Sequence, residues 1–143
     1  MSLRGFSTLI FLVDDVAAAT AWYTEFLGHA PVFTRPGPGG RVIYAKFAIG
    51  DHQGELALAD GTRAPAGRAA GTGGAIVHWR VDDVAATLAR LKAMGAQEYT
   101  PATAHGPFVT AVVVDPFGNL LGLQGLAATP HYTDDYHAVT TAN

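Results

Sequence analysis

The sequence predicts an α+β fold in which one βαβββ unit occurs twice in tandem. The main observation is a repeat, because residues 13–18 (VDDVAA) recur letter for letter as residues 81–86, 68 positions later. Each copy follows a short segment rich in β-branched residues and precedes an amphipathic segment that ends at a glycine. Self-similarity at a fixed period indicates a duplicated structural unit, so we expect the two halves to fold alike.

The first half begins with a predicted strand and helix. Residues 7–13 are apolar and too short for a helix, which favours a strand. Asp14 and Asp15 then supply an N-cap and a negative charge for a helix that begins at Val16. Gly28 suits the left-handed position that follows a helix. The apolar residues of this helix are spaced by three and four and form one stripe: Val16, Ala19, Tyr23, Phe26 and Leu27.

The second half repeats this order. Residues 75–81 read as a strand, Asp82 and Asp83 as the helix cap, and Gly95 as the helix stop. The corresponding apolar stripe consists of Val84, Leu88, Leu91 and Met94.

Three short strand candidates follow each helix and are separated by turns rich in glycine, proline and aspartate. They cover residues 31–34, 42–49 and 55–59 in the first half, and 98–100, 108–114 and 120–124 in the second. We expect a single domain over residues 1–143. Its parts are a first unit at about 5–60, a linker at about 61–73, a second unit at about 74–126 and a tail at about 127–143.

The composition excludes several classes of partner. Nine Lys and Arg against twelve Asp and Glu give a net charge of −3, which offers no basic surface for nucleic acid. The absence of cysteine excludes disulfides and thiolate chemistry and is compatible with a reducing cytosol. No apolar run approaches the roughly 20 residues of a membrane span, so we expect a cytoplasmic protein without a membrane partner.

The paired units, residues 22–28 (WYTEFLG) and residues 115–123 (DPFGNLLGL) resemble the vicinal oxygen chelate superfamily. That superfamily includes glyoxalase I, extradiol dioxygenases, fosfomycin-resistance enzymes and bleomycin-resistance binding proteins, and the resemblance covers about residues 6–125. It implies a curled antiparallel sheet around a cavity, with the helices on the outer face. It also implies a small organic ligand and a homodimer.

In metal-dependent members of the superfamily, each unit carries a His or Gln on its first strand and a carboxylate on its last. By the repeat, these positions fall on Thr8 and Glu55 in the first unit and on Ile76 and Gly122 in the second. Glu55 alone has a strong ligand side chain, and one carboxylate cannot hold a divalent cation with useful affinity. We therefore expect no metal at this site and no cofactor.

His78 is the strongest objection to a metal-free site. It lies two residues beyond Ile76 and shares its face of the strand. One alternative is a rearranged divalent-metal site that joins His78 and Glu55 to His105 or His52. The other is that His78 lines the pocket and bonds to a neighbour such as Glu55, with which it would form a catalytic acid–base pair.

Further polar and aromatic residues have the strand parity or loop position expected of a ligand pocket. For Lys46 and Arg80, the alternative is that their stems lie on apolar surface while the charges stay in solvent. The full set of predicted ligand-binding residues is Thr8, Tyr44, Lys46, Arg80, Tyr99, His105, Phe108, Phe117 and Gln124.

Two main function classes follow. The first, which we favour, is a metal-free protein of the bleomycin-resistance type that binds and sequesters a small molecule. The second is a glyoxalase-like lyase, an isomerase or a dioxygenase that uses Glu55 and His78. A third and weaker interpretation is a degenerate copy retained for interaction with other proteins.

Overall fold

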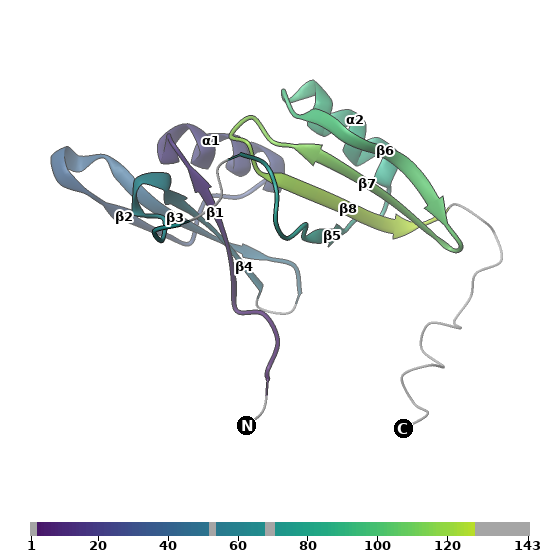
Figure 1. Ribbon diagram of the computed structural model, residues 1–143, viewed down its shortest axis with the longest axis horizontal. Coiled ribbons are helices and arrows are strands. Elements are labelled where there is room, and N and C mark those ends of the chain that lie inside the picture. Colours follow the sequence, from purple (N-terminus) through teal and green to yellow (C-terminus); the bar gives the residue numbers. More distant parts are fainter. Residues whose placement is uncertain (1–2, 52–53, 68–70, 128–143) are drawn as a thin grey trace. The chain divides into compact units, whose positions relative to one another are not determined.

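The computed structural model describes residues 3–51, 54–67 and 71–127 (Figure 1). The chain forms two compact units, of which the first comprises Met1–Gly74 with Val114–Asn119 and the second Ala75–Val113 with Leu120–Asn143. The elements of the first half are β1 (Thr8–Val13), α1 (Val16–Leu27), β2 (Phe33–Pro36), β3 (Val42–Ile49) and β4 (Gly54–Asp60), with short 3₁₀ turns at Pro38–Gly40 and Gly61–Arg63. Those of the second half are β5 (His78–Arg80), α2 (Val84–Ala93), β6 (Gln97–His105), β7 (Phe108–Val114) and β8 (Leu120–Leu126).

The predicted pair of βαβββ units is confirmed, and each unit has an open four-stranded sheet. The strand orders are β1-β4-β3-β2 and β5-β8-β7-β6. Both sheets are mixed and not purely antiparallel, because β1 runs parallel to β4 and β5 runs parallel to β8. A helical crossover after the first strand permits this arrangement, whereas the hairpin between β3 and β4 requires antiparallel pairing.

Strand bounds differ from the prediction where apolar alternation is weak. β6 spans nine residues, against three predicted, because its side chains are exposed except for half-buried Thr103 and give no inside–outside pattern. Pro101 is tolerated there because β6 is the edge strand of its sheet. β5 is shorter than predicted, although Val77 O still accepts a hydrogen bond from Gly122 N at 3.0 Å.

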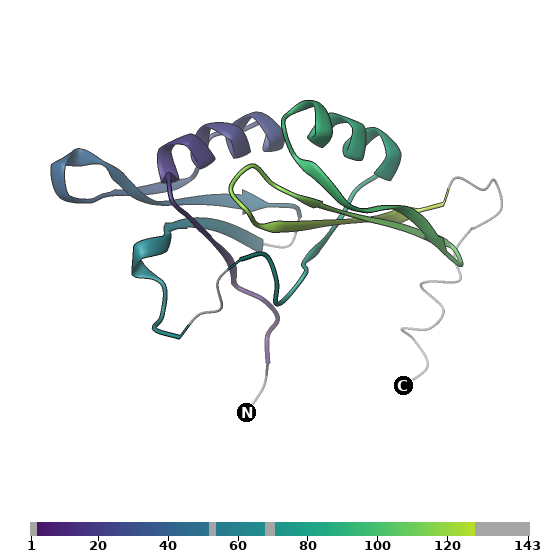
Figure 2. The ribbon, with the colours of Figure 1, turned by 45° about the horizontal axis from the view of Figure 1, so that its top comes forward.

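Both helices begin at the predicted aspartates. The Asp15 carboxylate accepts a hydrogen bond from Ala18 N at 3.0 Å, and Asp83 accepts one from Ala86 N at 2.8 Å. Gly28 ends α1 with φ at 79°. In each unit the helix lies over one face of its own sheet (Figure 2). No helix in the described part of the chain is long and apolar enough to cross a membrane.

The helix-facing side of the first sheet forms the core of its unit. In β1 and β3 the buried residues on this side alternate with half-buried or exposed ones, whereas β4 also buries Ala57, which lies on the other face. The side chains on the helix-facing side are Phe11, Val13, Ile43, Ala45, Phe47, Leu56 and Leu58. Thr8, Lys46 and Glu55 therefore lie on the opposite face, which α1 does not cover.

The turn between β7 and β8 belongs to the first unit. Its Asp115 is 3% exposed, and its carboxylate accepts hydrogen bonds from Tyr23 Oη at 2.6 Å, Phe117 N at 2.9 Å and Asn119 N at 2.8 Å. Burial raises the pKa of Asp115, and the hydrogen bonds act in the opposite direction. The buried carboxylate thus holds the turn against α1.

We predict that Asp15→Ala and Asp83→Ala each lower the free energy of unfolding by about 1 kcal/mol, because each leaves a helix N-terminal amide without its capping partner. Urea denaturation followed by circular dichroism measures the change. Asp14→Ala removes the same charge next to the cap and is the control. Equal losses for Asp14→Ala and Asp15→Ala would show that charge, and not capping, is responsible.

Candidate functional site

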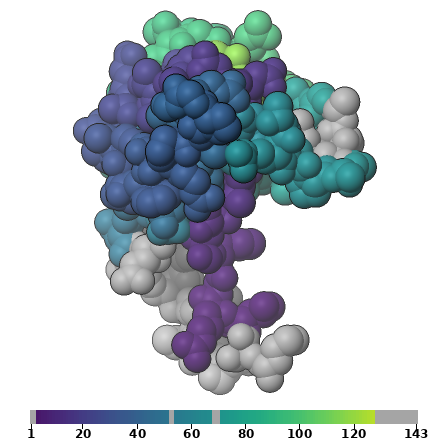
Figure 3. Space-filling view, turned by 90° about the vertical axis from the view of Figure 1, so that its left-hand side faces the viewer, coloured from purple at the N-terminus to yellow at the C-terminus, as the bar shows by residue number. Residues whose placement is uncertain are grey.

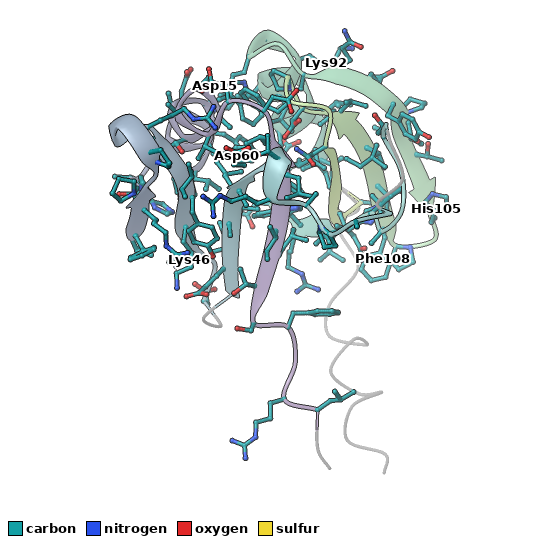
Figure 4. The ribbon with its side chains drawn as sticks, turned by 60° about the vertical axis from the view of Figure 1, so that its left-hand side comes forward. Asp15, Lys46, Asp60, Lys92, His105 and Phe108 are labelled. Atoms are coloured by element: carbon teal, nitrogen blue, oxygen red, sulfur yellow. The ribbon has the colours of Figure 1, made fainter. Side chains whose placement is uncertain are left out.

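Three predicted residues meet on the open face of the first sheet. Thr8 and Glu55 are direct partners in the β1–β4 register. Thr8 Oγ1 donates a hydrogen bond to Glu55 Oε2 at 2.9 Å, and Lys46 Nζ lies 3.0 Å from Glu55 Oε1. Figure 4 shows Lys46 away from Asp15 and α1. Both carboxylate oxygens of Glu55 therefore have a partner within the protein.

These contacts change the acidity of Glu55. The hydrogen bond from Lys46, followed by that from Thr8, lowers the pKa of Glu55 from its ordinary value of 4.5. Glu55 is therefore an anion at neutral pH and a weaker base than an ordinary glutamate. A lowered pKa opposes the use of Glu55 as a general base, because such a base works best with a pKa near the working pH.

In the second unit, His78 lies directly opposite Gly122 across the β5–β8 pair. The repeat pairs Ile76 with Gly122, but Ile76 precedes β5 and is 39% exposed. A Cβ atom added at Gly122 would lie only 2.8 Å from Cγ of His78. The imidazole therefore occupies the space that a side chain at position 122 would need.

A pocket of about 230 Å³ lies within the second unit. It brings together three predicted ligand-binding residues, because Arg80 and Gln124 are cross-strand partners and Phe108 lines the same pocket. A guanidinium, an amide and an aromatic ring around one small pocket are groups that can orient an organic molecule. The other lining residues are Val81, Asp82, Gly125 and Leu126.

The remaining predicted residues lie elsewhere. Tyr99 and His105 are exposed on β6, and neither lines the pocket of the second unit. Phe117 belongs to the turn in the first unit, where its ring contacts Trp22 edge-on at a centroid distance of 6.3 Å. His52, the other candidate for a rearranged metal site, lies outside the described residues.

Sequence reasoning missed Asp82 at the pocket and Arg35 on the open face of the first sheet. Asp82 was assigned to the helix cap, which Asp83 provides. The predicted strand ended at residue 34, whereas β2 continues to Pro36. Side chains alternate between the two faces along each strand, and residues paired across a hairpin share a face. Counting from Lys46 across the β2–β3 hairpin could therefore have placed Arg35 on this face.

The residues at the superfamily's metal positions do not fit a divalent cation. Glu55 is engaged by an ammonium group, Thr8 offers one hydroxyl, and Gly122 offers no side chain. Within residues 3–51, 54–67 and 71–127, no three His, Asp or Glu side chains cluster closely enough to hold a metal. Hard cations require several oxygen ligands, which this set does not supply.

We predict that Lys46→Met raises the pKa of Glu55 towards 4.5 and that Thr8→Val raises it by less, because Lys46 is the larger cause of the shift. Carbon-detected NMR titration of the Glu55 carboxyl measures both changes. Glu55 contributes stability above its unfolded pKa, and this contribution is lost as the pH falls through the folded value.

Lys92→Met, which removes the 3.3 Å ion pair with Glu98 in the second unit, is the matched control for this titration. An unchanged pKa of Glu55 in Lys46→Met would contradict the pairing described above.

Comparison with known proteins places this architecture in a family. The family model of the Glyoxalase/Bleomycin resistance protein/Dioxygenase superfamily matches residues 5–123. No curated protein matches the sequence. TnmS3, an antibiotic binding protein from Streptomyces sp. CB03234, is 26% identical with a TM-score of 0.65, over 89% of this chain and 99% of that one.

Two further solved structures share the fold. Protein ATC0852 from Agrobacterium tumefaciens is 23% identical with a TM-score of 0.71, over 87% of this chain and 99% of its own. Lactoylglutathione lyase from Agrobacterium tumefaciens is 20% identical with a TM-score of 0.60, over 87% of this chain and 96% of its own. From the family match over most of its length, the chain belongs to the Glyoxalase/Bleomycin resistance protein/Dioxygenase superfamily.

Proposed function

We propose that this chain is a metal-free member of its superfamily that binds and sequesters a small organic ligand. The observation that carries the proposal is the engagement of Glu55 by Lys46 Nζ at 3.0 Å and by Thr8 Oγ1 at 2.9 Å. Glu55 holds the position at which the superfamily's metal-dependent members place a carboxylate ligand. In this protein that carboxylate is already paired with the ammonium group of Lys46.

A divalent metal that binds Glu55 would have to share the carboxylate oxygens with Lys46 and Thr8 or displace these partners. Displacement would leave the Lys46 ammonium beside the incoming cation, where the two positive charges repel each other. The equivalent positions of the second unit offer few metal ligands, because Gly122 has no side chain that could bind a metal and His78 supplies a single imidazole. A single carboxylate and a single imidazole are too few ligands for the usual catalytic ions.

The groups that remain suit binding. The pocket of the second unit combines the Phe108 ring with the polar ends of Arg80 and Gln124, and the first unit presents Tyr44 beside Lys46 on its open face. A few polar groups among apolar and aromatic side chains can orient a bound ligand without catalysing a reaction. The likeness to TnmS3, an antibiotic binding protein, supports the same conclusion.

The enzymatic alternative assigns acid–base roles to Glu55 and His78. The lowered pKa of Glu55 argues against its role as the base, because the carboxylate is stabilised in its charged form.

We further propose that the protein acts in the cytoplasm as a homodimer, in line with the two-fold symmetry common among soluble oligomers.

We predict that a thermal-shift screen of cationic glycopeptides, aromatic metabolites and electrophiles finds a compound with a saturable shift. A ligand at one hundred times its dissociation constant stabilises the fold by about 2.7 kcal/mol. The shift should be the same before and after dialysis against a chelator. Phe108→Ala should reduce it, whereas Phe6→Ala, at a fully exposed phenylalanine ahead of β1, should not.

Three results would contradict the proposal. A screen without any saturable shift would remove the case for ligand binding. A shift that disappears with the chelator and returns with nickel, zinc, iron or manganese would establish a metal-dependent site. Turnover of a bound compound that is abolished by Glu55→Gln or His78→Ala would favour the enzymatic alternative.

A further inference from the structure

We infer that the open face of the β2–β3 hairpin is a subsite for a planar aromatic acid. The inference rests on the proposed function, because it specifies the ligand class that the binding protein takes. The subsite, called here the hairpin face, consists of Phe33, Arg35, Tyr44 and Lys46. The antiparallel register places Phe33 opposite Lys46 and Arg35 opposite Tyr44. Aromatic and cationic side chains therefore alternate along each strand and also across the strand pair.

The aromatic members form an accessible pair. The rings of Phe33 and Tyr44 are 6.1 Å apart between centroids and are inclined by 65°. Phe33 is 45% exposed, and Tyr44 is half-buried. Figure 3 shows that the β2–β3 segment, in blue, lies at the surface on this side of the first unit. An exposed ring that is braced by a second ring offers a flat apolar contact to another aromatic system.

The Arg35 guanidinium contacts one ring of this pair, that of Tyr44. Its Cζ atom lies 5.7 Å from the Tyr44 ring centroid, within the range of a cation–π contact. Stacking on a ring occupies the flat face of a guanidinium and leaves its N–H edge free to donate two parallel bonds to a carboxylate. Among the described residues, no carboxylate lies within ion-pair distance of Arg35.

The charge on this side of the sheet favours an anion. The charged strand residues with this parity in the first unit are Arg35, Lys46 and Glu55. Glu55 neutralises Lys46 through the 3.0 Å ion pair, which leaves the positive charge of Arg35 uncompensated. The whole chain carries a net charge of −3, so the hairpin face has the opposite sign to the protein. An aromatic ring with an attached carboxylate complements both features.

Protection of an exposed edge is the competing explanation, because natural edge strands carry charges that oppose aggregation. That explanation accounts for Arg35 on β2. It does not require the Phe33 ring to be exposed beside it, since an exposed apolar ring promotes edge association. The two explanations differ in whether the face discriminates between an aromatic acid and its neutral analogue.

The test uses 2-naphthoate, 2-naphthamide and 2-naphthylmethylammonium as probes of the full chain, with binding followed by ¹H–¹⁵N NMR. We expect 2-naphthoate to shift the amide signals of residues 33–35 and 44–46 and to bind at least about tenfold more tightly than 2-naphthamide, because of its charge-assisted bonds to Arg35. The ammonium probe should bind more weakly than either.

Three variants locate the effect. Arg35→Met keeps the side-chain stem and should abolish the preference for the acid, whereas Phe33→Leu should weaken the acid and the amide alike. Lys92→Met removes a surface cation of the second unit and should change neither affinity. Unfolding midpoints of all three variants are compared with the parent, so that a loss of binding is separated from a loss of fold.

The inference is overturned if the acid and the amide bind the hairpin face equally, if neither probe shifts the amide signals of residues 33–35 and 44–46, or if Arg35→Met keeps the preference for the acid. Binding of probes at the Arg80–Phe108 pocket alone would overturn the hairpin subsite but leave the proposed function standing. The proposed function fails separately, when the broader ligand screen finds no saturable binding.

Discussion

The parallel pairing of β1 with β4 determines what Glu55 can do. This pairing places Thr8 beside Glu55, while the antiparallel pairing of β4 with β3 brings Lys46 to the same face. The register is fixed by the other face, where Leu56 and Leu58 are fully buried. A slip of one residue would turn Glu55 towards the helix and expose these leucines, and burial of an unpaired carboxylate is costly. The packing of the core thus determines the chemistry of the open face.

The two units share a scaffold but no longer share a site. Both begin their helices with the same VDDVAA sequence and the same aspartate cap. At the strand positions, the first unit keeps a carboxylate that an internal ammonium neutralises, and the second unit has a glycine against which His78 packs. A carboxylate at Gly122 would collide with the imidazole. Duplication therefore preserved the elements that fold the chain, while the residues of the candidate site diverged.

The sequence was sufficient for features that depend on neighbours along the chain. Asp15, Asp83 and Gly28 were predictable because caps and stops act within one helical turn. β3 and β7 were predicted with their observed bounds. β6 was mostly missed, because an exposed edge strand has no dry face to impose alternation.

The contacts of the site were less predictable, because they depend on residues far apart in the chain. Parity placed Tyr44 and Lys46 on one face, but the ion pair between Lys46 and Glu55 depends on the β3–β4 register. The hydrogen bond from Tyr23 to Asp115 joins residues 92 positions apart and gave no local signal. The His78–Gly122 pairing was missed because the repeat count assumes the same register in both units.

The central claim is that Glu55 is occupied by Lys46 and is not available to a metal. Its most direct test is paramagnetic broadening of NMR signals by stoichiometric Mn²⁺, repeated with Ni²⁺, in protein that has been stripped with a chelator. We predict no selective broadening at Thr8, Glu55 or His78, either in the parent protein or in Glu55→Gln. Broadening centred on Glu55 and His78 that is lost in Glu55→Gln would contradict it.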